Sequence, residues 1–352
     1  MSPINLLPLQ PVMNSKKIAV IGAGSWGTAL SLHLSRLGYA VDLWVFEQDL
    51  CQAMQRSRAN TLFLPGHPLP DNIHPTNSLE AAAKDHSLIL MVVPSHVMRK
   101  VAENLHPQLM PGSLVINASK GLENETLSNM NEILRSTLGA NQLLATVSGP
   151  TFAAEIAGKP PSALVAAAED IATAERVQKI FDGPTVKVFT STDILGVEIG
   201  AALKNVIAIA TGISDGLQLG YNARAALITR GLVEISRIGT ALGARPETFY
   251  GLSGMGDLVL TCTGDLSRNR TVGMKLGQGH SLADITGSMN MVAEGVRTVK
   301  SAFTLKNKLS IQATIIDETY RILYENKPPQ KALEDIMRVK ISTEFSGVKG
   351  LK

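Results

Sequence analysis

The sequence has little of the chemistry on which several large classes of protein depend. Its 352 residues include only two cysteines, Cys51 and Cys262, which lie far apart in the chain. This spacing excludes a disulfide framework and a thiolate metal site. No cluster of histidine, cysteine and carboxylate residues indicates any other metal centre. Each thiol is either a nucleophile or an inert group, and the inert group is the simpler interpretation.

Aromatic residues are also scarce, at 4% of the chain, which disfavours stacking surfaces for single-stranded nucleic acid. The 33 basic and 30 acidic residues give a net charge of +3, and no block of like charges suggests a nucleic-acid partner. No uncharged run combines the length and apolarity of a membrane span, and residues 1–14 lack the positive charge of a signal peptide. We therefore expect a cytoplasmic protein with a loose extension at 1–14, no nucleic-acid partner and no stable membrane insertion.

The most informative segment present is residues 18–45. It places Gly22, Gly24 and Gly27 in G-x-G-x-x-G spacing, after an apolar run and before a helical pattern. The first glycine permits a tight turn, the second lets the backbone approach a pyrophosphate, and the third allows close helix packing. The helix N-terminus supplies N–H groups for the anion. Because the motif lies in a complete strand–helix–strand unit, it predicts dinucleotide binding; the alternative is a glycine-rich turn of another α/β protein.

The rest of the chain divides into two kinds of pattern. Up to residue 191, short apolar runs alternate with helical stretches, which predicts a parallel sheet with crossover helices. The expected strands are 17–21, 40–45, 87–93, 113–117, 143–147, 163–167 and 185–189. Long helical patterns follow at about 193–215, 221–243, 246–251, 268–277, 293–306, 310–324 and 329–338. We therefore expect an α/β fold, with a Rossmann-type doubly wound sheet at 15–191, an all-α domain at 192–341 and a tail at 342–352.

Compact polar or glycine-rich segments follow several of the expected strands, at residues 22–27, 94–96, 119–121 and 148–151. Ligands bind at the carboxyl ends of the strands in a doubly wound sheet, so we treat these segments as one site. A nicotinamide cofactor that reduces a carbonyl also needs a proton donor nearby. Six of the seven histidines precede residue 107, which leaves the helical domain without a suitable one. Of these, His33 is expected to pack or to be solvated, and His96 is a candidate cofactor contact.

Lys204 is a better candidate for the proton donor. It is the only charged residue between Ile199 and Ser214, among small and apolar neighbours that predict a buried helix. A buried ammonium must be paired, or its pKa falls toward neutrality, which suits acid/base catalysis. The alternatives are a snorkelling lysine or a structural ion pair, for instance with Asp257. Lys120, at the ligand edge of the sheet, is either a surface lysine or a contact to an anion or carbonyl.

A second informative segment is residues 251–270. Gly254, Gly256 and Asp257 are followed by the sequence SRNR at 267–270, which opens a predicted helix. Arginine with hydroxyl and amide side chains at a helix N-terminus suits a phosphate group, because the dipole and the guanidinium act together. A solvated arginine pair is the alternative. In a dehydrogenase, the pattern indicates a phosphorylated or otherwise anionic substrate.

These segments together resemble the bacterial-type glycerol-3-phosphate dehydrogenases over residues 17–341. The resemblance depends on the order of several motifs: GAGSWGTALS, ASKGLE, SGPTFAAE, EIGAALKNVIAIATGISDGL, GYNARAALITRGLVE, GLSGMGDLVLTC, SRNR and VAEGVRT. It implies reversible reduction of dihydroxyacetone phosphate to sn-glycerol 3-phosphate by NADPH or NADH. It also implies a supply of product to phospholipid synthesis and a homodimer.

The resemblance further implies roles for individual residues. Lys204 is then the acid/base residue. The expected substrate-binding residues are Lys120, Gly149, Thr151, Lys204, Asp257, Ser267, Arg268 and Asn269. The expected cofactor-binding residues are Gly22, Gly24, Ser25, Trp26, Gly27, Phe46, Lys120, Ala153, Arg268, Val292 and Glu294.

Cofactor preference is left open by one departure from the family pattern. Many relatives have basic or histidine side chains just after the second strand, whereas this chain has Val45, Phe46 and Glu47. Glu47 could accept a hydrogen bond from a ribose 2′-OH, as in NAD-preferring sites. Arg56 and Arg58 could still reach a 2′-phosphate. We expect dual use.

Two other functions compete with this interpretation. A related two-domain reductase with a catalytic lysine, of the ketopantoate reductase or 3-hydroxyacid dehydrogenase type, would act on a carboxylate substrate. A non-catalytic dinucleotide sensor would signal through the helical domain, but it has no need of a buried Lys204.

Overall fold

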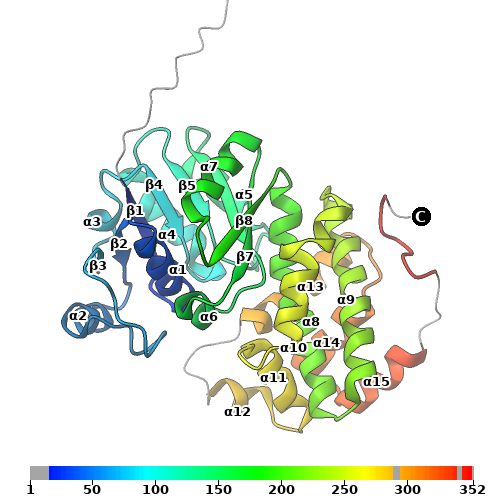
Figure 1. Cartoon of the computed structure of the whole chain (residues 1–352). Coiled ribbons are helices and arrows are strands. Elements are labelled where there is room, and N and C mark those ends of the chain that lie inside the picture. The colour runs from blue at the N-terminus through cyan, green and yellow to red at the C-terminus, as the bar shows by residue number, and fades with distance from the viewer. Residues whose placement is uncertain (1–15, 288–293, 339–342, 351–352) are drawn as a thin grey trace, which may run out of the picture.

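The computed structural model describes residues 16–287, 294–338 and 343–350. A sheet covered by helices occupies the first part of the chain, and a group of helices beside it occupies the second (Figure 1). The expected α/β class, with a helical second part, is confirmed.

In the part of the chain that the structure describes, the sheet has eight strands in the order β3-β2-β1-β4-β5-β6-β7-β8. The strands are β1 (Lys17–Ile21), β2 (Ala40–Trp44), β3 (Ile73–Thr76), β4 (Leu88–Met91), β5 (Leu114–Asn117), β6 (Leu143–Ser148), β7 (Ser162–Ala168) and β8 (Val186–Ser191). The strand order reverses between β1 and β4, which is the switch point where a doubly wound sheet binds its ligand. Strands β4 and β5 are buried along their whole length, because helices cover both faces of the sheet.

Within the described residues, seven helices surround the sheet. They are α1 (Ser25–Arg36), α2 (Gln48–Ser57), α3 (Leu79–Ala83), α4 (Met98–Leu105), α5 (Met130–Leu138), α6 (Ala153–Gly158) and α7 (Ile171–Phe181), with short 3-10 turns η1 (Ser95–Val97) and η2 (His106–Gln108). Helices α1, α2, α6 and α7 contribute to one apolar core, and α3, α4 and α5 contribute to another. The two cores lie on opposite faces of the sheet, each between the strands and the helices that cover them, as in a doubly wound fold.

Two expectations about the sheet were wrong. Strand β7 runs antiparallel to β6, so the sheet is not wholly parallel. Their connection contains only the six-residue helix α6, and an apolar run gives no sign of strand direction. Strand β3 was also missed, because Ile73–Thr76 is a four-residue edge strand that contains Pro75.

The helical part is built around α8 (Ile194–Gly216), which is buried along most of its length. The other helices are α9 (Gly220–Leu242), α10 (Asp257–Thr263), α11 (Arg268–Gly277), α12 (Leu282–Gly287), α13 (Glu294–Lys308), α14 (Thr314–Tyr324) and α15 (Pro329–Arg338), with turns η3 (Pro246–Tyr250) and η4 (Leu252–Gly256). Helices α10 and α12 were not expected. By length and composition α8 could cross a membrane, but 83% of its apolar window is buried inside the protein, as in a core helix.

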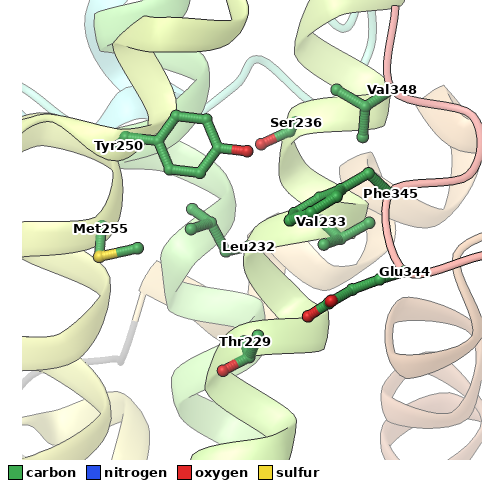
Figure 2. Close-up of a pocket in the computed structure, with 9 residues that line it drawn as sticks. All are labelled: Thr229, Leu232, Val233, Ser236, Tyr250, Met255, Glu344, Phe345 and Val348. Carbon is green, nitrogen blue, oxygen red and sulfur yellow. The ribbon is translucent and has the colours of Figure 1, made fainter. Parts of the chain in front are cut away.

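The C-terminal segment 343–350 lies against α9. Arg230 donates a hydrogen bond of 2.6 Å to the carbonyl oxygen of Glu344, and Arg237 donates to that of Ser346. A mainly apolar cavity of about 150 Å³ separates Phe345 and Val348 from Tyr250 and Met255 (Figure 2). None of the residues that line this cavity is an expected site residue.

Candidate active site

The glycine-rich turn after β1 has the geometry that its spacing predicts. Gly22 has a φ of +119°, and a Cβ atom there would lie 2.6 Å from the carbonyl oxygen of Val92. A Cβ atom on Gly27 would lie 1.9 Å from the carbonyl oxygen of Gly22, so α1 packs directly on the turn. Gly24 is the N-cap residue of α1 and has no side-chain cap, and a Cβ atom there would meet nothing within 4 Å. The N–H groups of the first turn of α1 and the open space beside Gly24 fit the diphosphate of a dinucleotide.

The first residues of α1 connect this turn to neighbouring loops. The hydroxyl of Ser25 donates a hydrogen bond of 2.6 Å to the carbonyl oxygen of Phe63. The indole N–H of Trp26 donates one of 3.0 Å to the carbonyl oxygen of Ala118, two residues before Lys120. Trp26 and Ala153, the first residue of α6, are half-buried against the same core. The turn, the loop after β5 and α6 therefore lie together.

Phe46 and Glu47 lie between β2 and α2. The Phe46 side chain is 73% exposed, and its ring meets that of Trp44 edge-on at 5.9 Å. Glu47 is the exposed N-cap residue of α2 and makes no capping hydrogen bond with its side chain. Arg58 donates a hydrogen bond of 3.0 Å to the carbonyl oxygen of Ile73 and another to Pro70. The guanidinium of Arg58 thus stabilises the backbone around β3. Arg56, the second arginine proposed to reach a 2′-phosphate, is exposed.

Lys204 lies at the junction of the sheet and the helices, and it is almost completely buried. Its Nζ donates hydrogen bonds of 2.6 Å to Oδ1 of Asp257 and 2.8 Å to Oγ1 of Thr261. Oδ2 of the same carboxylate accepts a hydrogen bond of 2.7 Å from Nζ of Lys120. One buried carboxylate at the start of α10 therefore binds a lysine from α8 and a lysine from the loop after β5.

The expected ion pair between Lys204 and Asp257 is present, and the pKa of the paired lysine is strongly shifted. Burial lowers the pKa of Lys204 to about 8. The negative charge of Asp257 opposes this effect, while the positive charge of Lys120 reinforces it. An amine with a pKa near 8 can both give and take a proton close to neutral pH.

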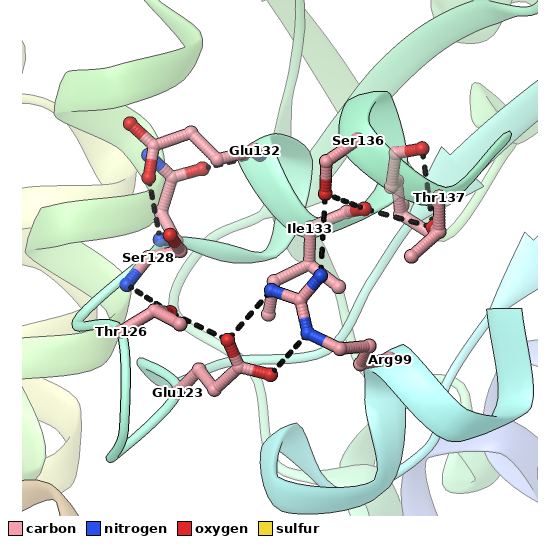
Figure 3. Close-up of polar contacts among 10 residues, drawn as sticks. Arg99, Glu123, Thr126, Ser128, Glu132, Ile133, Ser136 and Thr137 are labelled. Carbon is pink, nitrogen blue, oxygen red and sulfur yellow. Dashed lines mark hydrogen bonds and ion pairs between the residues drawn. The ribbon is translucent and has the colours of Figure 1, made fainter. Parts of the chain in front are cut away.

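The loop that carries Lys120 is attached firmly to the sheet domain. Gly121 has a φ of +141°, and a Cβ atom there would lie 2.7 Å from the side chain of Ser95. Glu123 forms a two-pronged ion pair with Arg99 of α4, with N···O distances of 2.8 and 2.7 Å, and also accepts from Thr126 (Figure 3). The bond to Arg99 lowers the pKa of Glu123. The sequence analysis identified neither the close packing of Gly121 nor the ion pair of Glu123, although both residues belong to the ASKGLE motif.

Gly149 and Thr151 lie beside Lys120. The carbonyl oxygen of Gly149 accepts hydrogen bonds from Lys120 Nζ at 3.3 Å and from the Thr151 hydroxyl at 3.2 Å. Gly149 has a φ of +147°, and a Cβ atom there would lie 2.8 Å from the carbonyl oxygen of Ala163. Only glycine fits this close approach of the loop after β6 to β7.

A side-chain cap, an ion pair and close packing against α8 hold the start of α11 in place. Ser267 is its N-cap, and the Ser267 hydroxyl accepts a 3.3 Å hydrogen bond from the backbone N–H of Arg270. The Arg270 guanidinium pairs with Asp215 of α8 at 2.7 Å, so this arginine serves helix packing. A Cβ atom on Gly212 would lie 2.1 Å from the carbonyl oxygen of Arg270, which shows how closely α8 and α11 pack.

Arg268 and Asn269, the first residues of α11, lie near the start of α13. Oδ1 of Asn269 accepts a hydrogen bond of 3.0 Å from the backbone N–H of Gly295. Burial raises the pKa of the neighbouring Glu294, while the positive charges of Arg268, Lys120 and Lys204 act in the opposite direction. The last expected cofactor contact, Val292, lies outside the described residues. The charges of Arg268 and of both lysines thus act on the same buried carboxyl group, that of Glu294.

His96 lies in the short turn η1 after β4 and stays a candidate cofactor contact, whereas His33 and the two cysteines lie in the apolar interior. His33 is buried, and its Nε2 donates a 2.7 Å hydrogen bond to the carbonyl oxygen of Phe181. Both cysteines are buried, and burial raises the pKa of Cys262 to about 12, which leaves its thiol unreactive. Within residues 16–287, 294–338 and 343–350, no group of three His, Cys, Asp or Glu side chains could hold a metal ion.

The fold and this arrangement define a class of protein: a two-domain, dinucleotide-dependent dehydrogenase with a buried lysine at its domain junction. Two family models match the chain, the NAD-dependent glycerol-3-phosphate dehydrogenase N-terminus over residues 17–174 and the C-terminus over residues 193–334. The chain belongs to the NAD-dependent glycerol-3-phosphate dehydrogenase family.

Individual relatives agree with this assignment. The chain is 52% identical to a glycerol-3-phosphate dehydrogenase [NAD(P)+] of Geobacter sulfurreducens, over 94% of this chain and 99% of that protein. It is 53% identical to the Geobacter metallireducens protein of the same name, over 92% and 97% of the two chains. The crystal structure of a glycerol-3-phosphate dehydrogenase from Coxiella burnetii is similar, with a TM-score of 0.89 and 37% identity over 92% of this chain and 99% of that one.

Proposed function

We propose that this protein reduces dihydroxyacetone phosphate to sn-glycerol 3-phosphate, reversibly and with NADPH or NADH, and that Lys204 is its acid/base residue. The observation that supports the role of Lys204 most directly is its burial on Asp257 with a pKa of about 8. The activity itself is the one in the names of relatives that are about half identical over nearly the whole chain.

The substrate phosphate binds at the start of α11 in this proposal. The guanidinium of Arg268, the amide of Asn269 and the N-terminus of α11 provide the positive charge and the donors. Ser267 acts there as the cap that shapes the helix start. Anchoring the remote phosphate orients the C2 carbonyl, and orientation of this kind contributes several kcal/mol to catalysis.

The carbonyl oxygen lies against the two lysines. Within the described part of the chain, Lys204 Nζ donates two hydrogen bonds, whereas an ammonium group has three N–H bonds. The third N–H bond points to the substrate oxygen in our proposal, and Lys120 beside Gly149 and Thr151 positions the other side of the substrate. When bound, the nicotinamide would supply the hydride for C2. Lys204 then donates its proton to the developing alkoxide, and in the reverse direction the neutral amine accepts the proton.

The cofactor lies over the glycine turn in this proposal. Gly22, Gly24 and Gly27 shape the diphosphate site, and Ser25 and Trp26 begin the helix whose N–H groups face it. Phe46 lies on the adenosine side. The other proposed cofactor contacts are Lys120, Ala153, Arg268, Val292 and Glu294.

The family resemblance and the composition support four further proposals. They are a supply of product to phospholipid synthesis, a location in the cytoplasm, a homodimeric assembly, and a domain boundary at residues 191 and 192. Light scattering of the purified protein tests the dimer directly.

A single assay tests the central proposal. Oxidation of NADPH and of NADH is followed with dihydroxyacetone phosphate and, in parallel, with ketopantoate. We expect turnover with the phosphate substrate only. Faster turnover with ketopantoate would replace this proposal with the carboxylate-reductase alternative, and tight NADH binding without any turnover would favour the sensor.

A further inference from the structure

Glu198 is a buried carboxylate that none of the proposed chemistry uses. It lies on α8, six residues before Lys204, and only 4% of its surface is exposed. Its Oε1 accepts hydrogen bonds of 2.7 Å from Asn117 Nδ2 and 2.5 Å from the Thr146 hydroxyl. Its Oε2 accepts one of 3.0 Å from the backbone N–H of Asn131. One side chain of the helical part thus receives three donors from the sheet part.

The positions of these donors connect Glu198 to the site. Asn117 is the last residue of β5, and it also bonds to the backbone of Ser119, next to Lys120. Thr146 lies on β6, three residues before Gly149. Asn131 lies in the first turn of α5. Glu198 therefore joins the helix of Lys204 to the carboxyl ends of the two strands whose loops carry Lys120 and Gly149.

Burying a carboxylate between two packed elements costs desolvation free energy. Burial raises the pKa of Glu198, and its three hydrogen bonds act against that effect. An apolar side chain of similar size would pack at this position without the desolvation cost. Three directed hydrogen bonds, however, fix the position of α8 along the strands, which apolar contact alone does not do.

We infer that Glu198 is a positioning residue: by fixing α8 against β5 and β6, it sets the geometry in which Lys204 and Lys120 share Asp257. This inference rests on the proposed role of Lys204. Glu198 itself touches none of the reacting atoms. Its loss moves the lysine relative to the carboxylate and the substrate, and a displacement of about 1 Å can cost about a hundredfold in rate.

The chain offers a matched control in Glu234. This glutamate of α9 is also buried, and its two oxygens accept 2.8 and 3.1 Å hydrogen bonds from the backbone N–H groups of Ile315 and Ile316 in α14. Its role is to join two helices of the helical part. Glu198→Gln and Glu234→Gln are therefore the same chemical change at two buried contacts between elements. Only the contact made by Glu198 involves the strands of the sheet.

The experiment compares wild type, Glu198→Gln, Glu234→Gln and Lys204→Ala. For each, kcat and KM for dihydroxyacetone phosphate are measured against pH, together with the dissociation constant of NADPH and the urea midpoint. We expect Glu198→Gln to lower kcat by about tenfold to a hundredfold. We also expect its alkaline limb to move to lower pH, because a lysine less closely paired with Asp257 loses its proton more readily, while NADPH affinity stays within about twofold. Glu234→Gln is expected to lower the urea midpoint and leave kcat and the limb unchanged.

The outcomes separate this inference from the proposed function. If Glu198→Gln loses stability as Glu234→Gln does and keeps its kcat and alkaline limb, the positioning role is wrong. If Lys204→Ala keeps near-normal turnover, the acid/base role of Lys204 is wrong, whatever Glu198→Gln does. Should Glu198→Gln fail to fold, Thr146→Val and Thr146→Ser give the same test. Thr146→Val removes the hydroxyl that donates to Glu198 and should lower kcat. Thr146→Ser keeps a hydroxyl and should have a kcat close to that of wild type. Equal kcat values in the two variants would overturn the inference.

Discussion

Lys204 and Lys120 donate hydrogen bonds to opposite oxygens of one carboxylate, that of Asp257, at 2.6 and 2.7 Å. Two positive charges thus share one negative charge in a buried setting. The unbalanced positive charge suits an anionic substrate, and it helps burial to lower the pKa of Lys204 to about 8. Asp257 therefore holds the lysine in place, while burial and the charge of Lys120 lower the pKa of its ammonium group.

The first prediction concerns removal of the amine. Lys204→Ala should lower kcat/KM for dihydroxyacetone phosphate by about 10²–10⁴-fold, the usual contribution of a general acid. NADH affinity, measured by fluorescence titration, should stay close to that of wild type, because the glycine turn is untouched. Lys306→Ala is the matched control, since Lys306 is also buried and pairs with Asp317 at 2.6 Å. We expect that control to lose stability and keep its activity; near-normal turnover in Lys204→Ala would remove Lys204 from the mechanism.

The second prediction is a pair of opposed pH profiles. Reduction needs the ammonium form of Lys204, so kcat/KM for reduction should fall as the pH rises above about 8. Oxidation of glycerol 3-phosphate needs the neutral amine, so its kcat/KM should rise with pH and level off above the same value. Asp257→Asn removes the charge that holds the proton on Lys204 and should move both limbs to lower pH. A reduction profile that stays flat through pH 8 and beyond contradicts the assignment.

The third prediction separates the phosphate from the carbonyl. Arg268→Met should lower kcat/KM for dihydroxyacetone phosphate by about 10–100-fold, because a charged hydrogen bond is worth about 1.5–3 kcal/mol. The slow reduction of unphosphorylated dihydroxyacetone should hardly change, since it has no group for the guanidinium to bind. Equal losses with the two substrates would place Arg268 elsewhere in the mechanism.

The fourth prediction concerns cofactor choice. Wild type should use NADPH and NADH with less than about a thousandfold preference, and Glu47→Ser should shift the ratio of their kcat/KM values toward NADPH by about tenfold. The reason is that a carboxylate at the end of β2 accepts a hydrogen bond from a 2′-OH and repels a 2′-phosphate. Asp49→Asn, an exposed carboxylate in the first turn of α2, controls for a general charge effect. An unchanged ratio in Glu47→Ser, or a stronger wild-type preference, would contradict this prediction.

Much of the fold could be predicted because its signals are local. The turn at 22–27 needs a positive φ at Gly22 and close packing at Gly27, and both requirements leave glycines in the sequence. Helix α8 is recognisable because its apolar surface continues around the whole helix. Strand β3 was missed because it is an edge strand that contains Pro75. Helices α10 and α12 were missed because they have seven and six residues, too few to show a helical period.

The sequence by itself determined the two-part order of the chain, the glycine turn and the isolated lysine on an apolar helix. It also suggested Asp257 as a partner of Lys204. Only the tertiary structure brought Lys120, which lies 137 residues before Asp257, to the other oxygen of that carboxylate. Only the tertiary structure likewise brought Glu198 of α8 into hydrogen bonds with β5 and β6. The reason is physical: backbone conformation and helix burial follow from neighbouring residues, whereas an ion pair depends on how a helix packs against a sheet, which no local pattern records.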